Sequence, residues 1–268
     1  MTDQEKQAQF YVPLVSALVD DLLTLTNHIL IQRVDYDHGD PEQLMLLSFV
    51  TKQREHLNSV RLLTTHNYDG DAGLISRTMI EGMAQLLWAF QNRPSGPEDW
   101  YWFGLVMDWR QVTENEANGI KEPAEKKQLL TTNLAAQGPR YYTSKAEEKL
   151  SQGDPLPADP YRKQWHRLNV ADIFTKVKGA DMYDDVYRNL SERIHWNPRE
   201  VFRSLEFDNG SSSTYKSSDA RTALGALVYG FQSLHQCLEL IGAHFSLDIQ
   251  PELNGLFSKF QQTTNLTP

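Results

Sequence analysis

Cysteine is almost absent from this chain of 268 residues, which contains only Cys237. A single cysteine cannot form an intramolecular disulfide, and this fits a reducing compartment. The eight histidines include no His-x-x-x-His pair and the sequence has no Cys-x-x-Cys, so the common structural zinc motifs are excluded. We predict that Cys237 is a small buried hydrophobe within a helix.

Uninterrupted apolar runs and an excess of basic residues are missing as well. The N-terminus, MTDQEKQAQFYVPLV, is polar and acidic where an export signal would be basic and then apolar. No stretch holds the roughly 18 consecutive apolar residues of a membrane span, so we expect a cytoplasmic protein without membrane contacts. The formal net charge of -9 argues against a broad nucleic-acid-binding surface, because such surfaces neutralise phosphates with Lys and Arg.

The motifs of several enzyme classes are missing too. The sequence has no G-x-S-x-G, no P-loop and no G-x-G-x-x-G. It therefore lacks the motifs that are typical of serine hydrolases, P-loop nucleotide kinases and dinucleotide-binding enzymes. We therefore predict no cofactor. A divalent metal held between distant helices stays open, with Glu81, His195 and His235 as its ligands, although His235 also fits a hydrogen-bonded core histidine on an apolar stripe.

Helical periodicity is what the sequence offers throughout. Apolar residues recur every three or four positions in nearly every long segment, whereas strand alternation with hairpin turns is not seen. We predict an all-α fold, a single bundle of about four or five long antiparallel helices with short accessory helices, in one domain over residues 1–268 with its core at about 5–245. The expected helices are Glu5–Arg33, Glu42–His66, Ala72–Asn92, an aromatic helix containing Trp100 to Trp109, Ala171–Val177, Tyr183–His195, Ala220–His244 and Pro251–Gln261.

Some details of these elements can also be predicted. Asp40 should cap the helix that begins beside Pro41. The helix over 72–92 is apolar nearly all round and should be the most buried one. Residues 114–160 would form a charged arm, either a solvated helix or a helical hairpin followed by a proline-rich loop, and 207–218 an irregular polar loop. The first helix would bury the stripe Leu14, Leu18, Leu22, Leu25 and Ile29.

Two charged residues interrupt the apolar helix over 72–92. Arg77 and Glu81 are spaced i, i+4, so both side chains lie on one face of that helix. Buried charges destabilise a fold unless they are paired and hydrogen-bonded. Two apolar residues in their place would often stabilise the fold at least as much as the ion pair does. The pair therefore indicates either a functional site or a structural ion pair that fixes the helix register.

A second polar group lies in the helix that ends before Pro198. Tyr187, Ser191 and His195 step by four and share one face, whereas Arg188 lies one position further round. His195 would end this helix, where it can titrate near neutral pH. The row fits hydrogen bonds to neighbouring helix ends, and it also fits a polar pocket. We predict that it forms a pocket with the Arg77/Glu81 helix, and the sequence does not name the ligand or substrate.

With these residues in view, the chain resembles an uncharacterised bacterial all-helical family, a domain of unknown function. Three motifs carry the resemblance over about residues 40–245: R-x-x-x-E at Arg77 to Glu81, W-x-x-L-N-V at Trp165 to Val170, and Y-x-x-L-S-x-x-x-H at Tyr187 to His195. The resemblance implies an α-helical fold and a shared site near Arg77, Glu81, Tyr187, Ser191 and His195. It implies no established activity.

A second resemblance is to the HEPN ribonucleases, helical dimers that cut RNA with an R-x(4 to 6)-H motif. Arg188, Asn189 and His195 give R-N-x(5)-H. This resemblance implies metal-independent RNA cleavage and a homodimer, with His195 as general acid or base and Arg188 stabilising charge on the phosphate. The acidic balance of the chain departs from that expectation, since it gives RNA little electrostatic attraction.

A third function, without catalysis, is also open. The aromatic segment with Trp100, Trp102 and Trp109, and the charged region 114–134 after it, could bind a protein partner or a second copy. Burial of the three tryptophans in the core of the chain would remove the main support for this interaction module.

Overall fold

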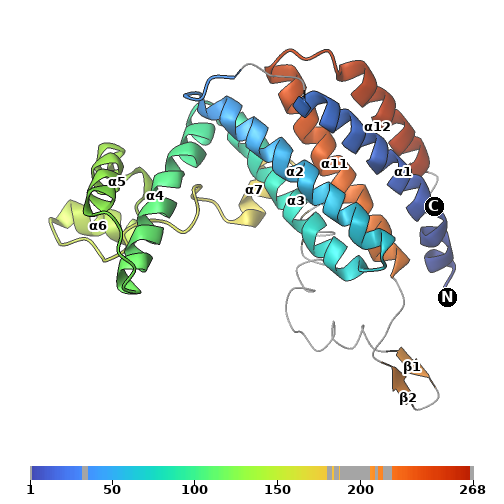
Figure 1. Cartoon of the computed structure of the whole chain (residues 1–268), viewed down its shortest axis with the longest axis horizontal. Coiled ribbons are helices and arrows are strands. Elements are labelled where there is room, and N and C mark those ends of the chain that lie inside the picture. The colour runs from blue at the N-terminus through green and yellow to red at the C-terminus, as the bar shows by residue number, and fades with distance from the viewer. Residues whose placement is uncertain are drawn as a thin grey trace. The chain divides into compact units, whose positions relative to one another are not determined.

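The computed structural model describes residues 2–31, 36–179, 183, 187, 206–208, 211–213 and 219–265. These residues are almost entirely helical (Figure 1), which confirms the all-α prediction. The contacts divide the chain into two compact units. Unit 1 comprises residues 1–88 and 170–268, and unit 2 comprises residues 89–169. This division by contacts does not test the single domain that we expect from the sequence, which therefore stays a prediction.

Unit 1 is built around long helices that pack side by side (Figure 1). Helix α1 (Asp3–Ile31) packs against α2 (Pro41–Thr65), α11 (Ala220–His244) and α12 (Gln250–Asn265). The face of α1 that meets these helices buries Ala8, Tyr11, Val15, Leu18, Leu22, Thr26 and Ile29.

The predicted apolar stripe of α1 was partly wrong. Leu14 is 44% exposed, whereas the adjacent Val15 is fully buried. Adjacent positions on a helix point about 100° apart, and apolar residues occupy both of them here. The inward face therefore runs from Tyr11 through Val15 to Leu18, and Leu14 points outward.

By length and composition alone, α1 is also apolar enough over Asp3–Leu30 to cross a membrane. Core helices of soluble proteins pass the same test, and α1 packs here on three other helices.

Helix α2 begins where the sequence predicts. The Asp40 side chain accepts hydrogen bonds from the backbone N–H groups of Glu42 and Gln43, and Pro41 occupies the first turn, where its missing N–H is harmless. In the middle of α2, the Gln53 Nε2 donates to the carbonyl oxygen of Met79 at 2.7 Å. This bond joins α2 to α3 (Asp69–Gln91), so α3 lies beside α2 in unit 1.

Helix α11 is buried around more of its circumference than α3, which corrects the expectation that the helix over 72–92 is the most buried one. Asp219 caps α11 through a side-chain bond to the Thr222 backbone N–H. The backbone N–H of Asp219 itself donates to Asp69 Oδ2 at 2.7 Å, which ties the start of α11 to the start of α3.

Two shorter elements complete the description of unit 1. Helix α7 (Val170–Lys176) buries Ile173 and Phe174 and matches the short helix expected there. Within 207–218, where an irregular loop was expected, β1 (Glu206–Asp208) pairs antiparallel with β2 (Ser211–Ser213). The prediction of an irregular loop was therefore wrong for residues 207–208 and 211–213, and the other residues of this segment lie outside the described part of the chain.

Unit 2 contains α4 (Ser95–Ala117), α5 (Ala124–Ala136), the 3-10 helix η1 (Gly138–Tyr141) and α6 (Ser144–Gln152). Helices α4 and α5 contact each other, and Lys127 forms an ion pair with Glu116 across them. Of the two forms expected for the charged region, the helical hairpin is the one observed. After Gln152, residues 153–169 are without helix, as their prolines predict.

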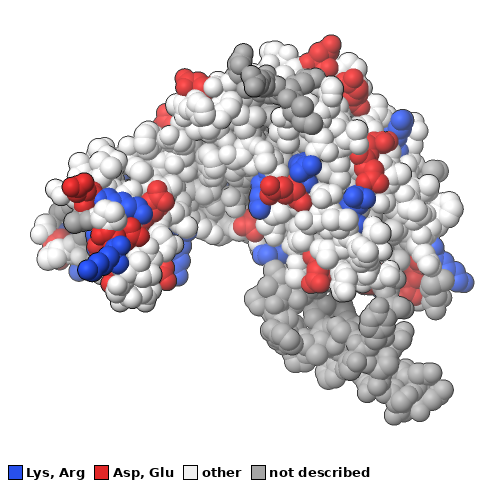
Figure 2. Space-filling model, in the orientation of Figure 1, with Lys and Arg blue, Asp and Glu red and all other residues white. Residues whose placement is uncertain are grey.

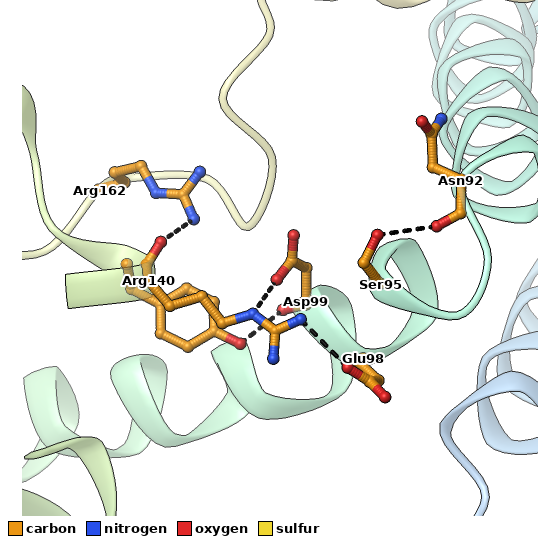
Figure 3. Close-up of polar contacts among 7 residues, drawn as sticks. Asn92, Ser95, Glu98, Asp99, Arg140 and Arg162 are labelled. Atoms are coloured by element: carbon orange, nitrogen blue, oxygen red, sulfur yellow. Dashed lines mark hydrogen bonds and ion pairs between the residues drawn. The ribbon is translucent and has the colours of Figure 1, made fainter. Parts of the chain in front are cut away.

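Arg140 holds η1 against the first turns of α4 (Figure 3). Its guanidinium contacts the carboxylates of Asp99 and Glu98, the latter at 3.2 Å. The Nη2 of Arg162 donates to the backbone oxygen of Arg140 at 2.8 Å, so the non-helical segment after α6 is hydrogen-bonded to η1. These polar contacts join η1, α4 and the segment after α6, and they supplement the buried apolar residues of unit 2, such as Phe103, Val106 and Leu134.

Candidate functional site

Helix α3 places three polar side chains in a row. Arg77, Glu81 and Gln85 are spaced by four residues and lie on one face, and all three are half-buried. Gln85 Nε2 donates to Glu81 Oε1 at 3.3 Å. The face that carries this row is therefore shielded in part from solvent but is not sealed in the core.

Tyr187 joins the two charged residues of this row. The Arg77 Nη2 donates to the Tyr187 hydroxyl at 2.6 Å, and the hydroxyl donates to Glu81 Oε2 at 2.9 Å. The Arg77 guanidinium carbon also lies 4.4 Å from the centroid of the Tyr187 ring, within cation–π range. One phenol thus bridges a cation and an anion that are a helical turn apart. We name Arg77, Glu81 and Tyr187 the bridged triad.

Aromatic rings hold Tyr187 in place. The ring of Phe174 in α7 is fully buried, and its centroid lies 5.6 Å from the centroid of the Tyr187 ring. The Tyr183 ring stacks on the Tyr187 ring, with 5.3 Å between the centroids and 19° between the planes. Tyr187 is itself only 8% exposed. Because aromatic pairs at these separations add stability beyond their buried area, the contacts with Phe174 and Tyr183 help to hold the Tyr187 ring where its hydroxyl meets Arg77 and Glu81.

The electrostatics of the bridged triad keep the phenol protonated. Burial, then the neighbouring Glu81 carboxylate, raise the pKa of Tyr187 to about 12, against the opposing effect of Arg77. At neutral pH the hydroxyl therefore donates to Glu81 and accepts from Arg77, and it is not a nucleophile. What the triad can do chemically is orient a guanidinium and a carboxylate.

The other members of the predicted Tyr-Ser-His face lie outside the described residues. These are Ser191 and His195, together with Arg188 of the R-N-x(5)-H motif. Of the predicted catalytic set, the structure brings together Arg77, Glu81 and Tyr187. The pocket and the roles of the remaining residues stay predictions.

His235 has the surroundings of a core histidine. It is 2% exposed, its ring stacks with Phe257 at 4.7 Å, and its Nε2 lies 3.3 Å from the carbonyl oxygen of Leu253 on α12. Burial lowers the pKa of His235 below its ordinary value. In the parts of the chain that the structure describes, no group of three or more His, Cys, Asp or Glu side chains is placed to hold a metal ion. The metal set of Glu81, His195 and His235 stays a prediction.

Sequence reasoning missed three residues around the bridged triad, namely Gln85, Phe174 and Tyr183. Gln85 could have been found, because it continues the i, i+4 spacing of Arg77 and Glu81. Phe174 and Tyr183 carry no comparable local signal, since their contacts with Tyr187 depend on how α7 lies against the segment after it.

The tryptophans of the proposed interaction module are not core residues of unit 2. Trp100, Trp102 and Trp109 are each half-buried along α4. Trp109 meets Tyr161 edge-on at 5.1 Å. Because the three tryptophans are not fully buried, their burial does not rule out the interaction module, which stays a prediction.

Comparison with protein families places these residues in a wider group. The model of a family of unknown function, DUF5677, matches residues 43–212, well over half of the chain. The matched range includes every predicted site residue from Arg77 to His195 and leaves out α1, α11 and α12. No curated protein and no solved structure matches the chain.

Proposed function

The chain belongs to the family of unknown function DUF5677, and from this membership we propose that its function resides at the bridged triad. The triad forms one wall of a polar pocket on α3, and the segment from Tyr187 to His195 forms the other. The pocket takes a small polar ligand or substrate. The hydrogen bonds of the Tyr187 hydroxyl to both Arg77 and Glu81 are the observation that carries this proposal.

The charges on α3 support a binding role. Arg77 and Glu81 are the two charged residues of α3 after its first turn, and such a half-buried pair adds little stability compared with apolar side chains. Recognition of a ligand would explain their presence better than stability does. An arginine presents a planar fork of N–H donors that suits carboxylate or phosphate groups, and Glu81 accepts hydrogen bonds. A matching ligand therefore combines an anionic group with a hydrogen-bond donor.

Thermal-shift titration tests this pocket. Nucleoside monophosphates, sugar phosphates and amino acids would be titrated into the wild type, Arg77→Gln, Glu81→Gln and the control Thr78→Ala, which changes an exposed residue of the same helix. We expect a compound that stabilises the wild type and Thr78→Ala alike and binds at least about tenfold more weakly to the two triad variants, a difference of about 1.4 kcal/mol. Equal affinity for all four proteins would overturn the pocket.

A second candidate, RNA cleavage, rests on the sequence motif R-N-x(5)-H, formed by Arg188, Asn189 and His195. Tyr187, whose contacts the structure describes, is the residue directly before Arg188, and the segment from Arg188 to His195 lies outside the described residues. In this proposal, the 2′-hydroxyl attacks the phosphorus and the bond to the 5′-oxygen breaks, which leaves a 2′,3′-cyclic phosphate and a 5′-hydroxyl. His195 moves the proton of the attacking or leaving oxygen, and Arg188 stabilises the charge on the phosphate.

The surface charge sets an expectation for such an enzyme. On the face drawn in Figure 2, Lys and Arg side chains are interspersed with Asp and Glu and do not merge into one basic surface. Because the formal net charge of the chain is -9, we expect RNA binding to be weak and to change little with salt concentration.

Cleavage of a labelled single-stranded RNA in the presence of EDTA tests the second candidate. The wild type and the control His66→Ala, which alters an exposed histidine, should both cleave, whereas His195→Ala and Arg188→Ala should lose at least about 100-fold in rate, the usual scale of general acid–base catalysis. Activity that survives in His195→Ala would remove this candidate and leave the pocket proposal untouched.

A further inference from the structure

The outer face of α1 carries an apolar stripe that is exposed and that none of the described residues of the chain covers. Phe10 is 65% exposed and Leu14 is 44% exposed, and Pro13 and Ala17 are also exposed. Positions 10, 13, 14 and 17 follow the i, i+3, i+4, i+7 pattern of one helical face. Single exposed apolar residues are ordinary on a surface, but a contiguous stripe indicates an interaction site. We name these four residues the α1 stripe.

The stripe cannot be buried by a rotation of α1 within unit 1. The opposite face of the helix is already packed, with Val15, Val19 and Leu22 fully buried against the bundle. Turning α1 to hide Phe10 would expose those residues instead. The stripe is therefore a standing feature of the folded unit, and covering it requires something other than α1's own neighbours.

Charges of opposite sign frame the stripe. Lys6 lies four residues before Phe10 and Asp21 lies four residues after Ala17, so both fall on the same helical face as the stripe. Both are exposed. Lys6 lies 3.6 Å from Asp3 within the chain, but that carboxylate is fully exposed, and such surface pairs contribute little. From Lys6 to Asp21, this face carries a cation, an apolar centre and an anion in that order, and the exposed Asp3 lies one helical turn before Lys6.

This order is self-complementary when two copies of α1 run antiparallel about a two-fold axis. With the axis between Pro13 and Leu14, Lys6 of one copy faces Asp21 of the other, and the same pair forms a second time. Phe10 then faces Ala17, so a large side chain meets a small one. A symmetric dimer uses one patch twice in this manner.

From this pattern we propose that the α1 stripe is a homodimer interface, in which a second copy of the chain docks its own α1 antiparallel to the first. The charge pattern favours this occupant over a lipid surface, because the exposed Asp21 at one end of the stripe is repelled by an anionic bilayer, while the neighbouring Asp20 pairs with Arg61 of α2. Helix α1 lies outside residues 43–212, so the proposed interface is not part of the region that the family model matches. It is independent of the function proposed for the bridged triad.

Charge exchange across the interface tests the proposal. Sedimentation velocity of the full chain over a range of concentrations should show a monomer–dimer equilibrium. Lys6→Asp alone and Asp21→Lys alone should each weaken the dimer at least about tenfold, because each places like charges opposite one another twice. Lys52→Asp, which makes the same charge change at an exposed residue of α2, serves as the control and should leave the dimer intact.

Two rescues separate loss of pairing from loss of folding. The double variant Lys6→Asp with Asp21→Lys restores opposite charges and should dimerise like the wild type. A mixture of the two single variants should form a heterodimer, since one copy then carries two aspartates and the other two lysines at the facing positions. A wild type that is monomeric at every concentration would overturn the proposal. So would a dimer that Lys6→Asp leaves unchanged, or a monomer that floats with phosphatidylcholine vesicles.

Discussion

Tyr187 connects parts of the chain that are far apart in sequence, because its hydroxyl contacts side chains that precede it by 106 and 110 residues. Spacing on one helix could single out Arg77 and Glu81, since a local rule places residues i and i+4 on one face. No local rule says which later residue will meet them. The row Tyr187, Ser191 and His195 led to the prediction that this helix is the partner of Arg77 and Glu81. The structure describes the position of Tyr187 in this row.

Removal of the Tyr187 hydroxyl should destabilise unit 1. In Tyr187→Phe, Arg77 loses an acceptor and Glu81 loses a donor in a half-buried setting, which costs about 1–3 kcal/mol in the free energy of unfolding. Urea denaturation at pH 7 measures the difference. Tyr68→Phe removes a hydroxyl from a 60% exposed side chain and should change stability by less than about 0.5 kcal/mol. Equal effects of the two variants would show that the bridge contributes nothing.

His235 should make the protein less stable in mild acid. Burial holds the pKa of His235 below its ordinary value of 6.5, so between the two pKa values the unfolded chain binds more protons than the folded one. Its contribution is fully present above pH 6.5 and is lost as the pH falls toward the folded-state pKa. The pKa of His56 is lowered by burial as well, and it acts in the same direction.

Urea denaturation from pH 7.5 to 5.0 checks the sign of this dependence. The wild type should lose stability as the pH falls, and His235→Gln should show a shallower slope whatever its stability at pH 7.5. His66→Gln, a change at an exposed histidine, reports how the loss of a surface histidine affects the slope. A slope as steep in His235→Gln as in the wild type would contradict the prediction.

Cys237 should be inert in the folded protein. The thiol is fully buried, and burial raises its pKa to about 12, so little thiolate exists near neutral pH. Because it is the only cysteine, the reaction of the chain with Ellman's reagent reports on this one site. We expect no reaction within minutes in buffer at pH 8 and one equivalent released in 6 M guanidinium chloride. Rapid native labelling would place the thiol outside the core.

Among the elements, helix starts were more predictable than helix faces. The Asp40-Pro41 pair fixed the start of α2, because a capping oxygen and a proline without N–H suit that position. The inward face of α1 was harder to predict because Leu14 and Val15 are both apolar. Which of them is buried depends on α2, α11 and α12, whose arrangement no local pattern contains.

The turn between α3 and α4 depends on a glycine. A Cβ atom added to Gly96 would lie 2.4 Å from the backbone oxygen of Ala89 and 2.7 Å from its Cα, and backbone cannot move aside cheaply. Gly96→Ala should therefore lower the free energy of unfolding by about 1–3 kcal/mol or more, the range seen for overpacking.

Gly104, on the same helix α4, is the matched control. A Cβ there would meet nothing within 4 Å. Because alanine favours the helix interior over glycine, Gly104→Ala should raise stability by about 0.5–1 kcal/mol. Differential scanning calorimetry of both variants should show melting temperatures that move in opposite directions. A shared direction would contradict the close approach at Gly96.

For the whole molecule, the fold class could be predicted and the division into units could not. Helical periodicity runs through both units, so the sequence indicated an all-α protein at once. The boundary of unit 2 at residue 89 falls inside α3, whose apolar pattern continues across it without a linker. Composition gives no sign of a boundary at such a point, because boundaries are read from polar or proline-rich linkers.

The chain order of the two units has a consequence for biosynthesis. Unit 2 is one continuous segment, whereas unit 1 is made of residues from both sides of it. Proteins emerge from the ribosome N-terminus first, so unit 2 is complete while unit 1 still lacks α7, α11 and α12. During that interval the inward faces of α1 and α2 have no α11 to cover them. The nascent chain therefore exposes these apolar faces until α11 has emerged, and a chaperone that binds apolar segments can cover them during that interval.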